Sequence, residues 1–203
     1  MNHKIYILLF CFVVVFFPPT LYAQNSPDES PTDDLGNVED KFQEYFFEAL
    51  KQKAIENYDR SVEALLECKA LDNTIPVVYF ELGKNYNELK NFGSAEEAFK
   101  EAVKKDPQNE WYLDALYEFY VQQSDYNNAI KSAKQLVNYH PDYKEDLVGL
   151  YYRTKQFDEA LTILDEMDAE FGISMSRDTM RNRIYEVTGR KEDQIKNLEN
   201  RIE

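Results

Sequence analysis

Apolar residues recur at intervals of three and four from about residue 39 almost to the end of the chain, with polar residues between them. This spacing is typical of amphipathic helices, which turn one apolar face toward a core. Only 6 glycines and 7 prolines occur in the 203 residues, too few turn residues for a many-stranded sheet fold. The pattern therefore predicts an all-α fold.

The helical pattern also repeats along the chain. Five equivalent positions, which we use as anchors, are separated by 34, 34, 31 and 34 residues: Ser61, Ala95, Ala129, Ala160 and Gln194. A period of this length indicates a solenoid of helix–turn–helix units, each of which packs only on its neighbours. Because the fourth unit is shorter, its first helix is expected to start almost directly after Pro141.

The second unit has the most complete set of signature residues, which are Leu82, Gly83, Tyr86, Phe92, Ala95, Phe99, Ala102 and Pro107. Gly83 and Ala95 are small where the two helices of one unit must approach closely, and Pro107 stands where the second helix must stop. These residues resemble the tetratricopeptide-repeat (TPR) consensus. On this basis the chain is identified as a member of the TPR family, of an exported bacterial type.

The resemblance implies a right-handed α-α superhelix, or solenoid, of about five TPR-like repeats within residues 39–203. The expected repeats are 42–74, 75–108, 109–141, 142–174 and 175–203. In the third repeat Tyr117 replaces the glycine, and this larger residue is expected to widen the helix pair. The fifth repeat has Gln194 instead of a small anchor and is expected to end part-way through its second helix.

In proteins of this family, the first helices of successive repeats line a concave groove that binds segments of a partner. The resemblance places ten residues of this chain in the groove, namely Phe46, Leu50, Val77, Phe80, Lys84, Trp111, Asp114, Glu118, Tyr152 and Arg153. An apolar wall bordered by charges predicts a protein or peptide partner. A second reading stays open, in which the leader, the first helix or another copy of the chain covers this wall.

The N-terminal residues 1–23 have the pattern of a secretory signal peptide: Lys4, then the apolar run 5–17, then a small residue, Ala23, before the cleavage point. Thirteen apolar residues are too few to span a bilayer, which needs about 20. We therefore expect export to the periplasm, the envelope or the medium, with no integral membrane span after cleavage. Residues 24–38 are polar, acidic and proline-bearing, which predicts a flexible leader.

Composition and chemistry narrow the function further. The net charge of −15 disfavours a nucleic-acid partner, because an acidic surface repels phosphates. The sequence contains no motif for catalysis, phosphate binding or metal binding, so neither an enzyme activity nor a cofactor is expected. Cys68 falls at a small core position, and His140 precedes Pro141 in a turn, so packing and turn roles are favoured for both.

The sequence thus favours a non-enzymatic interaction scaffold of the bacterial cell envelope that binds a partner segment in its groove. The alternative is an accessory subunit or domain that positions an envelope enzyme or a secretion or assembly machine. Self-association is compatible with either function.

Overall fold

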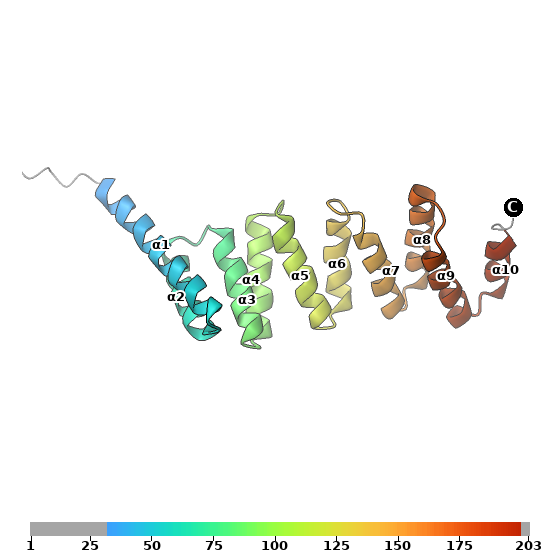
Figure 1. The fold of residues 1–203 in the computed structure, drawn as a ribbon, viewed down its shortest axis with the longest axis horizontal. Coiled ribbons are helices and arrows are strands. Elements are labelled where there is room, and N and C mark those ends of the chain that lie inside the picture. The colour runs from blue at the N-terminus through green and yellow to red at the C-terminus, as the bar shows by residue number, and fades with distance from the viewer. Residues whose placement is uncertain (1–31, 200–203) are drawn as a thin grey trace, which may run out of the picture.

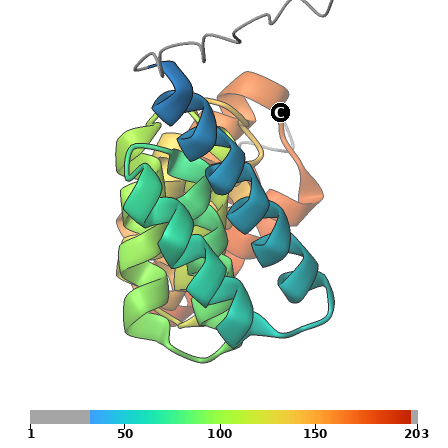
Figure 2. The same ribbon diagram turned by 90° about the vertical axis from the view of Figure 1, so that its left-hand side faces the viewer.

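The computed structural model describes residues 32–199, apart from the side chains of 32–35, and this part of the chain consists of ten α-helices without a strand. The helices follow one another along one long axis (Figure 1), and the later pairs lie behind the first two when the array is viewed from its N-terminal end (Figure 2). In chain order they are α1 (Thr32–Ala54), α2 (Tyr58–Leu71), α3 (Pro76–Glu88), α4 (Phe92–Lys105), α5 (Glu110–Gln122), α6 (Tyr126–Leu136), α7 (Tyr143–Arg153), α8 (Phe157–Phe171), α9 (Met175–Thr188) and α10 (Lys191–Glu199). The predicted all-α, TPR-like solenoid is confirmed.

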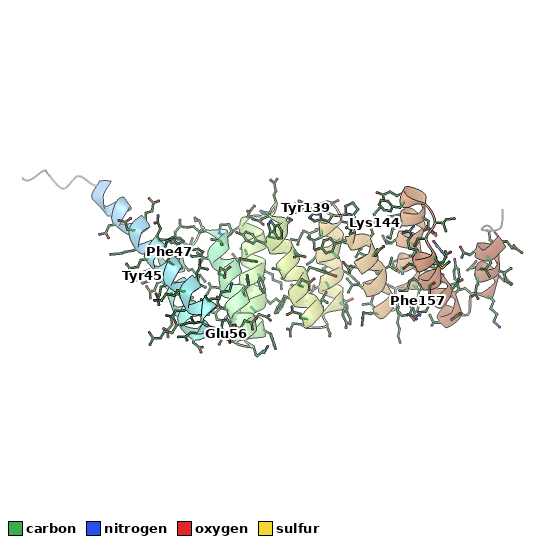
Figure 3. The ribbon with its side chains drawn as sticks, in the orientation of Figure 1. Tyr45, Phe47, Glu56, Tyr139, Lys144 and Phe157 are labelled. Carbon is green, nitrogen blue, oxygen red and sulfur yellow. The ribbon has the colours of Figure 1, made fainter. Side chains whose placement is uncertain are left out.

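The turn inside each helix pair has the same backbone geometry in every repeat. One residue per turn is left-handed, with φ between 59° and 73°: Glu56, Lys90, Ser124, Lys155 and Gly189. Each of these residues precedes an anchor by five positions, as Glu56 precedes Ser61 (61 − 56 = 5). The turns therefore repeat in the register of the anchors. The first of them is marked by Glu56 in Figure 3, between α1 and α2.

Helix α1 begins earlier than the sequence predicted. It starts at Thr32, so residues 32–38, which were assigned to a flexible leader, are helical. The predicted signal peptide, 1–23, and the remainder of the leader, 24–31, lie outside the described residues.

Two hydrophobic clusters form the core and meet at the second repeat. One cluster lies among α1 to α4 and includes Leu65 and Val78, and the other extends from α4 to Ile184 on α9. The rings of Phe80 and Tyr86 pack against both clusters. Since each repeat of a solenoid is stabilised by its neighbours, these shared contacts couple the N-terminal repeats to the rest of the array.

The close approach predicted for the second repeat is present. The α3–α4 pair is packed more tightly than α5–α6, and a Cβ atom at Gly83 would lie 2.7 Å from Cδ1 of Phe99. Tyr117, which replaces the glycine in the third repeat, is buried, and its ring packs edge-on against Tyr143 of α7 with centroids 5.4 Å apart. The larger residue therefore loosens its own helix pair and contacts the next repeat.

Two glycines at the middle of first helices give opposite predictions. We expect Gly83→Ala to lower the free energy of unfolding by about 1–3 kcal/mol, because the added Cβ would collide with the Phe99 ring. At Gly149 on α7 an added Cβ would meet no atom within 4 Å. Because alanine is a better helix former than glycine, Gly149→Ala should stabilise the fold by about 0.5–1 kcal/mol. Chemical denaturation of both variants measures the two effects, and a stable Gly83→Ala variant would contradict the packing described for α3 and α4.

The last repeat is joined to the array through a charged cluster. Asp168 of α8 accepts hydrogen bonds from Arg177 (2.6 Å) and Arg181 (2.6 Å) of α9, and all three side chains are at most 14% exposed. Burial opposes ionisation of Asp168, but the two guanidinium groups outweigh it and hold the pKa of Asp168 below its usual value. On α10, by contrast, the apolar side chains Ile195 and Leu198 are exposed.

Candidate functional site

The residues predicted to line the groove all belong to α1, α3, α5 and α7. We call the side of the array formed by these helices and α9 the first-helix face. Contacts between successive first helices link it along its length: Lys53 with Glu81, Phe80 with Tyr112, and Asp114 with Tyr143. The structure therefore brings the predicted residues together on one continuous face.

The N-terminal part of this face is apolar. Phe46 is half-buried and stacks on Phe42 with ring centroids 6.0 Å apart. Leu50 is exposed and Val77 is half-buried. Phe80 differs, because its ring packs against Tyr112 (5.1 Å) and Phe99 (6.4 Å) between the two clusters. Phe80 is thus first a packing residue, and only its remaining surface is open to a partner.

Two lysines of this part share a single carboxylate. Lys53 Nζ lies 2.5 Å from Glu81 Oε2, and Lys84 Nζ lies 3.9 Å from Glu81 Oε1 and 5.0 Å from the centroid of the Phe80 ring. Burial, and then the neighbouring Lys53, lower the pKa of Lys84. Lys53 and Lys84 thus place two cations around one anion at this point of the face, although α1 and α3 also carry exposed acids such as Glu44 and Glu88.

The middle part of the face, over α5 and α7, has the opposite charge. Asp114 accepts a hydrogen bond from the Tyr143 hydroxyl, and Glu118, Glu145 and Asp146 are exposed. Within residues 36–199, whose side chains are described, none of these four carboxylates forms a salt bridge. The middle of the face is therefore rich in carboxylates that form no salt bridge.

Two of these carboxylates, Glu118 and Asp146, lose hydration although they reach solvent. The surrounding helices, and then the charges of Asp114 and Asp146, raise the pKa of Glu118. The pKa of Asp146 is raised by the same loss of hydration and then by Glu145 and Asp114. Groups that the fold holds in such an unfavourable state are candidates for a functional site, because a ligand of opposite charge would relieve them.

A cleft of about 320 Å³ lies beside these carboxylates. It is lined by Tyr117, Val121, Tyr126, Glu145, Asp146, Gly149, Leu150 and Arg153. The Arg153 guanidinium lies 5.6 Å from the centroid of the Tyr126 ring, so one wall of the cleft already holds a cation against an aromatic surface. Tyr152, also predicted in the groove, packs edge-on against Phe157 with centroids 5.7 Å apart and is half-buried.

A second cleft continues the face toward α9. Its volume is about 440 Å³, and its apolar lining includes Val148, Leu164, Met167 and Met180. Glu145 lines both clefts, so the hollow surface is continuous from α5 to α9. Near the start of α5, Trp111 is 71% exposed and borders a smaller cleft of about 80 Å³ together with Asp114 and Tyr143.

Asp146, Tyr143 and Met180 belong to this surface but were not among the predicted groove residues. Asp146 belongs to the surface through its charge interactions with Glu145 and Asp114, and Tyr143 belongs to it through its contacts with Asp114 and Tyr117. The only feature of the sequence that could have indicated these residues was the shortened spacing of the fourth repeat, which starts α7 directly after Pro141 and Asp142. The predicted residues Leu50, Lys84, Trp111, Glu118 and Arg153 do reach the surface.

The acidic middle of the face predicts a stability effect. Because the folded state raises the pKa of Glu118 and Asp146, it binds protons more strongly than the unfolded chain. Stability therefore falls as the pH rises from the ordinary values of 3.8 for Asp and 4.5 for Glu through the raised values. We expect the Glu118→Gln/Asp146→Asn variant to have a higher Tm than the parent at pH 7, and this gain to disappear in acid.

Thermal melts across the pH range test this expectation. Glu63→Gln/Glu159→Gln removes two exposed acids from the second helices α2 and α8 and is the matched control. Equal changes in Tm for both pairs would mean that the effect comes from total charge. A lower Tm for the Glu118→Gln/Asp146→Asn variant would mean that these residues stabilise the fold.

Cys68 and His140 could carry reactive chemistry, but their contacts favour structural roles. Cys68 is fully buried, burial raises the pKa of its thiol to about 11, and its Sγ lies 3.7 Å from the Phe42 carbonyl oxygen. His140 Nε2 lies 2.9 Å from Glu110 Oε2 at the turn before α7. No cluster suited to a metal ion occurs among the described residues. Within the same residues, no helix has the length and apolar character needed to cross a membrane.

Five helix pairs in one register, with their first helices forming a continuous hollowed face, define a TPR solenoid, a fold consistent with a scaffold for protein–protein interaction. Residues 39–146 match the family described as the Psidin N-terminal TPR repeats region, and the chain belongs to this family. No curated protein has a significant match to the sequence.

Solved structures of TPR proteins have the same fold. The structure titled MamA AMB-1 superimposes with a TM-score of 0.59 at 18% identity, over 79% of this chain and 90% of that one. YrrB, described as a TPR protein with an unusual peptide-binding site, gives 0.58 at 14% identity, over 81% and 87%. A structure of Naa15/Naa10 bound to HypK-THB gives 0.70 at 19% identity, over 82% of this chain but only 27% of that one.

Proposed function

We propose that this chain is a non-enzymatic scaffold that holds a segment of a partner protein against its first-helix face. The observation that carries the proposal is the continuity of that face: two clefts share Glu145, and Trp111 stands exposed beside a third. A large aromatic side chain costs free energy when it is left in water, and such residues are enriched where proteins bind. The peptide-binding site named for YrrB, a protein of the same fold, gives further support.

We further propose that the scaffold acts in the cell envelope of a bacterium. This part rests on the sequence alone, since residues 1–23 combine a basic start, an apolar run and a small residue before the cleavage point. Mass spectrometry of the protein from fractionated cells tests it. A mature chain that begins at Gln24 in an envelope or secreted fraction is the expected result, whereas an intact N-terminus in the cytosol would contradict export.

A pull-down from envelope extract tests the binding function. The bait is the chain from Gln24, compared with a Leu50→Ala/Trp111→Ala variant that removes two exposed apolar side chains from the first-helix face. Leu66→Ala/Phe171→Ala is the matched control, because both residues are exposed on second helices. We expect partners to be lost with the first variant and retained with the control.

The result also separates this function from the alternative. Retention of all partners by both variants would contradict a role for the first-helix face. Stable recovery of one enzyme or one assembly machine in fixed proportion would favour the accessory subunit over the general scaffold. We leave Phe80 out of this test because its ring packs in the core, so its removal would change stability as well as binding.

A further inference from the structure

We infer that the partner segment is basic, and that its Lys or Arg side chains lie over the cleft between α5 and α7. This inference rests on the proposed function and specifies the chemistry of the partner. It combines three observations on the same surface: a cleft large enough for side chains, carboxylates that form no salt bridge, and an aromatic wall that already holds a guanidinium.

The carboxylates supply the charge complementarity. Asp114, Glu118, Glu145 and Asp146 contribute four negative charges, whereas Arg153 is the only cation among the residues that line the cleft. Other exposed acids of the described residues, such as Glu63 and Glu159, also form no salt bridge, but these four lie close enough together that Asp114 adds to the effect of burial in raising the pKa of both Glu118 and Asp146. A basic segment would neutralise the unpaired group, and the charge on the surface would speed its association.

The cleft itself favours Lys or Arg over a simple cation. Arg153 lies over the Tyr126 ring at 5.6 Å, and the Tyr117 side chain and Gly149 also line the cleft, where Gly149 leaves open space. A long side chain therefore has an apolar and aromatic surface for its stem and carboxylates for its charged end. A small inorganic cation would use only the carboxylates.

The N-terminal part of the face fixes where the basic stretch lies. Lys53 and Lys84 share one carboxylate there, and their excess positive charge would repel the same segment. The basic stretch is thus directed away from Lys53 and Lys84 and toward the carboxylates of α5 and α7. Repulsion at the wrong site is an ordinary source of specificity in protein recognition.

The test is a selection of short random peptides displayed on phage against the immobilised chain from Gln24. We expect the selected peptides to be enriched in Lys and Arg relative to the starting library. Synthetic versions should bind Glu118→Lys/Asp146→Lys on the order of tenfold more weakly than the parent, with the difference reduced at high salt. The control Glu63→Lys/Glu159→Lys, with the same charge change on second helices, should bind almost as well as the parent.

A second variant tests whether weaker binding comes from loss of the fold. Glu118→Gln/Asp146→Asn removes two charges that the fold disfavours, so weaker binding by this variant cannot be attributed to unfolding. Its melting curve is measured beside the titration. We expect weaker binding together with an unchanged or higher Tm.

Three outcomes would overturn the inference. Selected peptides that are acidic or purely apolar, or basic peptides that bind the Glu118→Lys/Asp146→Lys variant as tightly as the parent, would exclude recognition of a basic segment at this cleft. Equal weakening by both charge-reversal pairs would mean attraction by the net charge of −15 alone. In each case the Leu50→Ala/Trp111→Ala variant decides whether the proposed function stands. If this variant loses peptide binding, the proposed function is left intact. If it keeps peptide binding, the proposed function is contradicted as well.

Discussion

Replacing Asp168 by alanine is expected to release the last helix pair from the array. Asp168 contacts both Arg177 and Arg181, and all three side chains are almost inaccessible to solvent. Its removal takes from Arg177 the anion that it pairs with and leaves Arg181 with only the exposed Asp165, and an uncompensated buried charge costs about 3–5 kcal/mol. In a solenoid this cost falls on the repeat that carries it, so α9 and α10 should open while α1 to α8 stay folded.

Hydrogen exchange with mass spectrometry measures this opening region by region. We expect amides of α9 and α10 to exchange roughly a hundredfold faster or more, and those of α3 to α6 to be unchanged. Asp165→Ala is the matched control, because Asp165 contacts the same Arg181 at 2.5 Å but its side chain is 72% exposed. Its loss should cost at most about 1 kcal/mol. Equal effects of the two substitutions would contradict the role of burial.

The same contact makes the last repeat sensitive to acid. Because the folded state lowers the pKa of Asp168, the stabilisation is complete above the ordinary value of 3.8 and is lost as the pH falls through the lowered value. An acid titration of the parent, followed by circular dichroism, should therefore include loss of the C-terminal helices below pH 3.8. The Asp168→Ala variant should lack this step.

Phe99→Ala is expected to destabilise the middle of the array by about 3–5 kcal/mol. The ring is buried, lies 5.6 Å from the Phe119 ring and 6.4 Å from the Phe80 ring, and fills the space left by Gly83. Chemical denaturation measures the loss. Phe92→Ala on the same helix is the control, and should cost much less because Phe92 is partly exposed.

A double-mutant cycle makes this prediction specific. Gly83→Ala should be destabilising in the parent, where its Cβ meets the Phe99 ring, but neutral or stabilising in the Phe99→Ala background, where that ring is gone. Additive effects of the two substitutions would mean that residues 83 and 99 do not share the contact.

Most of the fold follows from the sequence because the repeat signals are local. The anchors predicted the register, and the left-handed turn residues from Glu56 to Gly189 follow it at every repeat. The start of α1 was missed because the prolines and acids before residue 32 resemble a leader, and the helix-start sequence Thr32-Asp33-Asp34 was read as part of it.

The surface was predictable only in part, for a physical reason. The resemblance to the repeat family placed Trp111, Glu118 and Arg153 among the groove residues, and all three are exposed on first helices. Helical periodicity gives only the direction of a side chain around its own helix and does not indicate which neighbour covers it. Phe80 is therefore more enclosed than predicted, because Tyr112 and Phe99 pack on its ring. The pKa of Asp146 is raised by burial and in part by Asp114 in the preceding repeat. The pattern of a single helix does not contain such a relation between helices.

The central claim is that a partner lies on the first-helix face, and Trp111 permits a direct test. It is the only tryptophan in the chain, it is exposed on this face, and incorporation of fluorotryptophan would give one ¹⁹F signal. The ¹⁹F spectrum is recorded with and without the unlabelled partner recovered in the pull-down. A shifted signal with less exposure to solvent, in the parent and in Leu66→Ala/Phe171→Ala alike, is the predicted result. A signal that remains unchanged at saturating partner would contradict binding at this face.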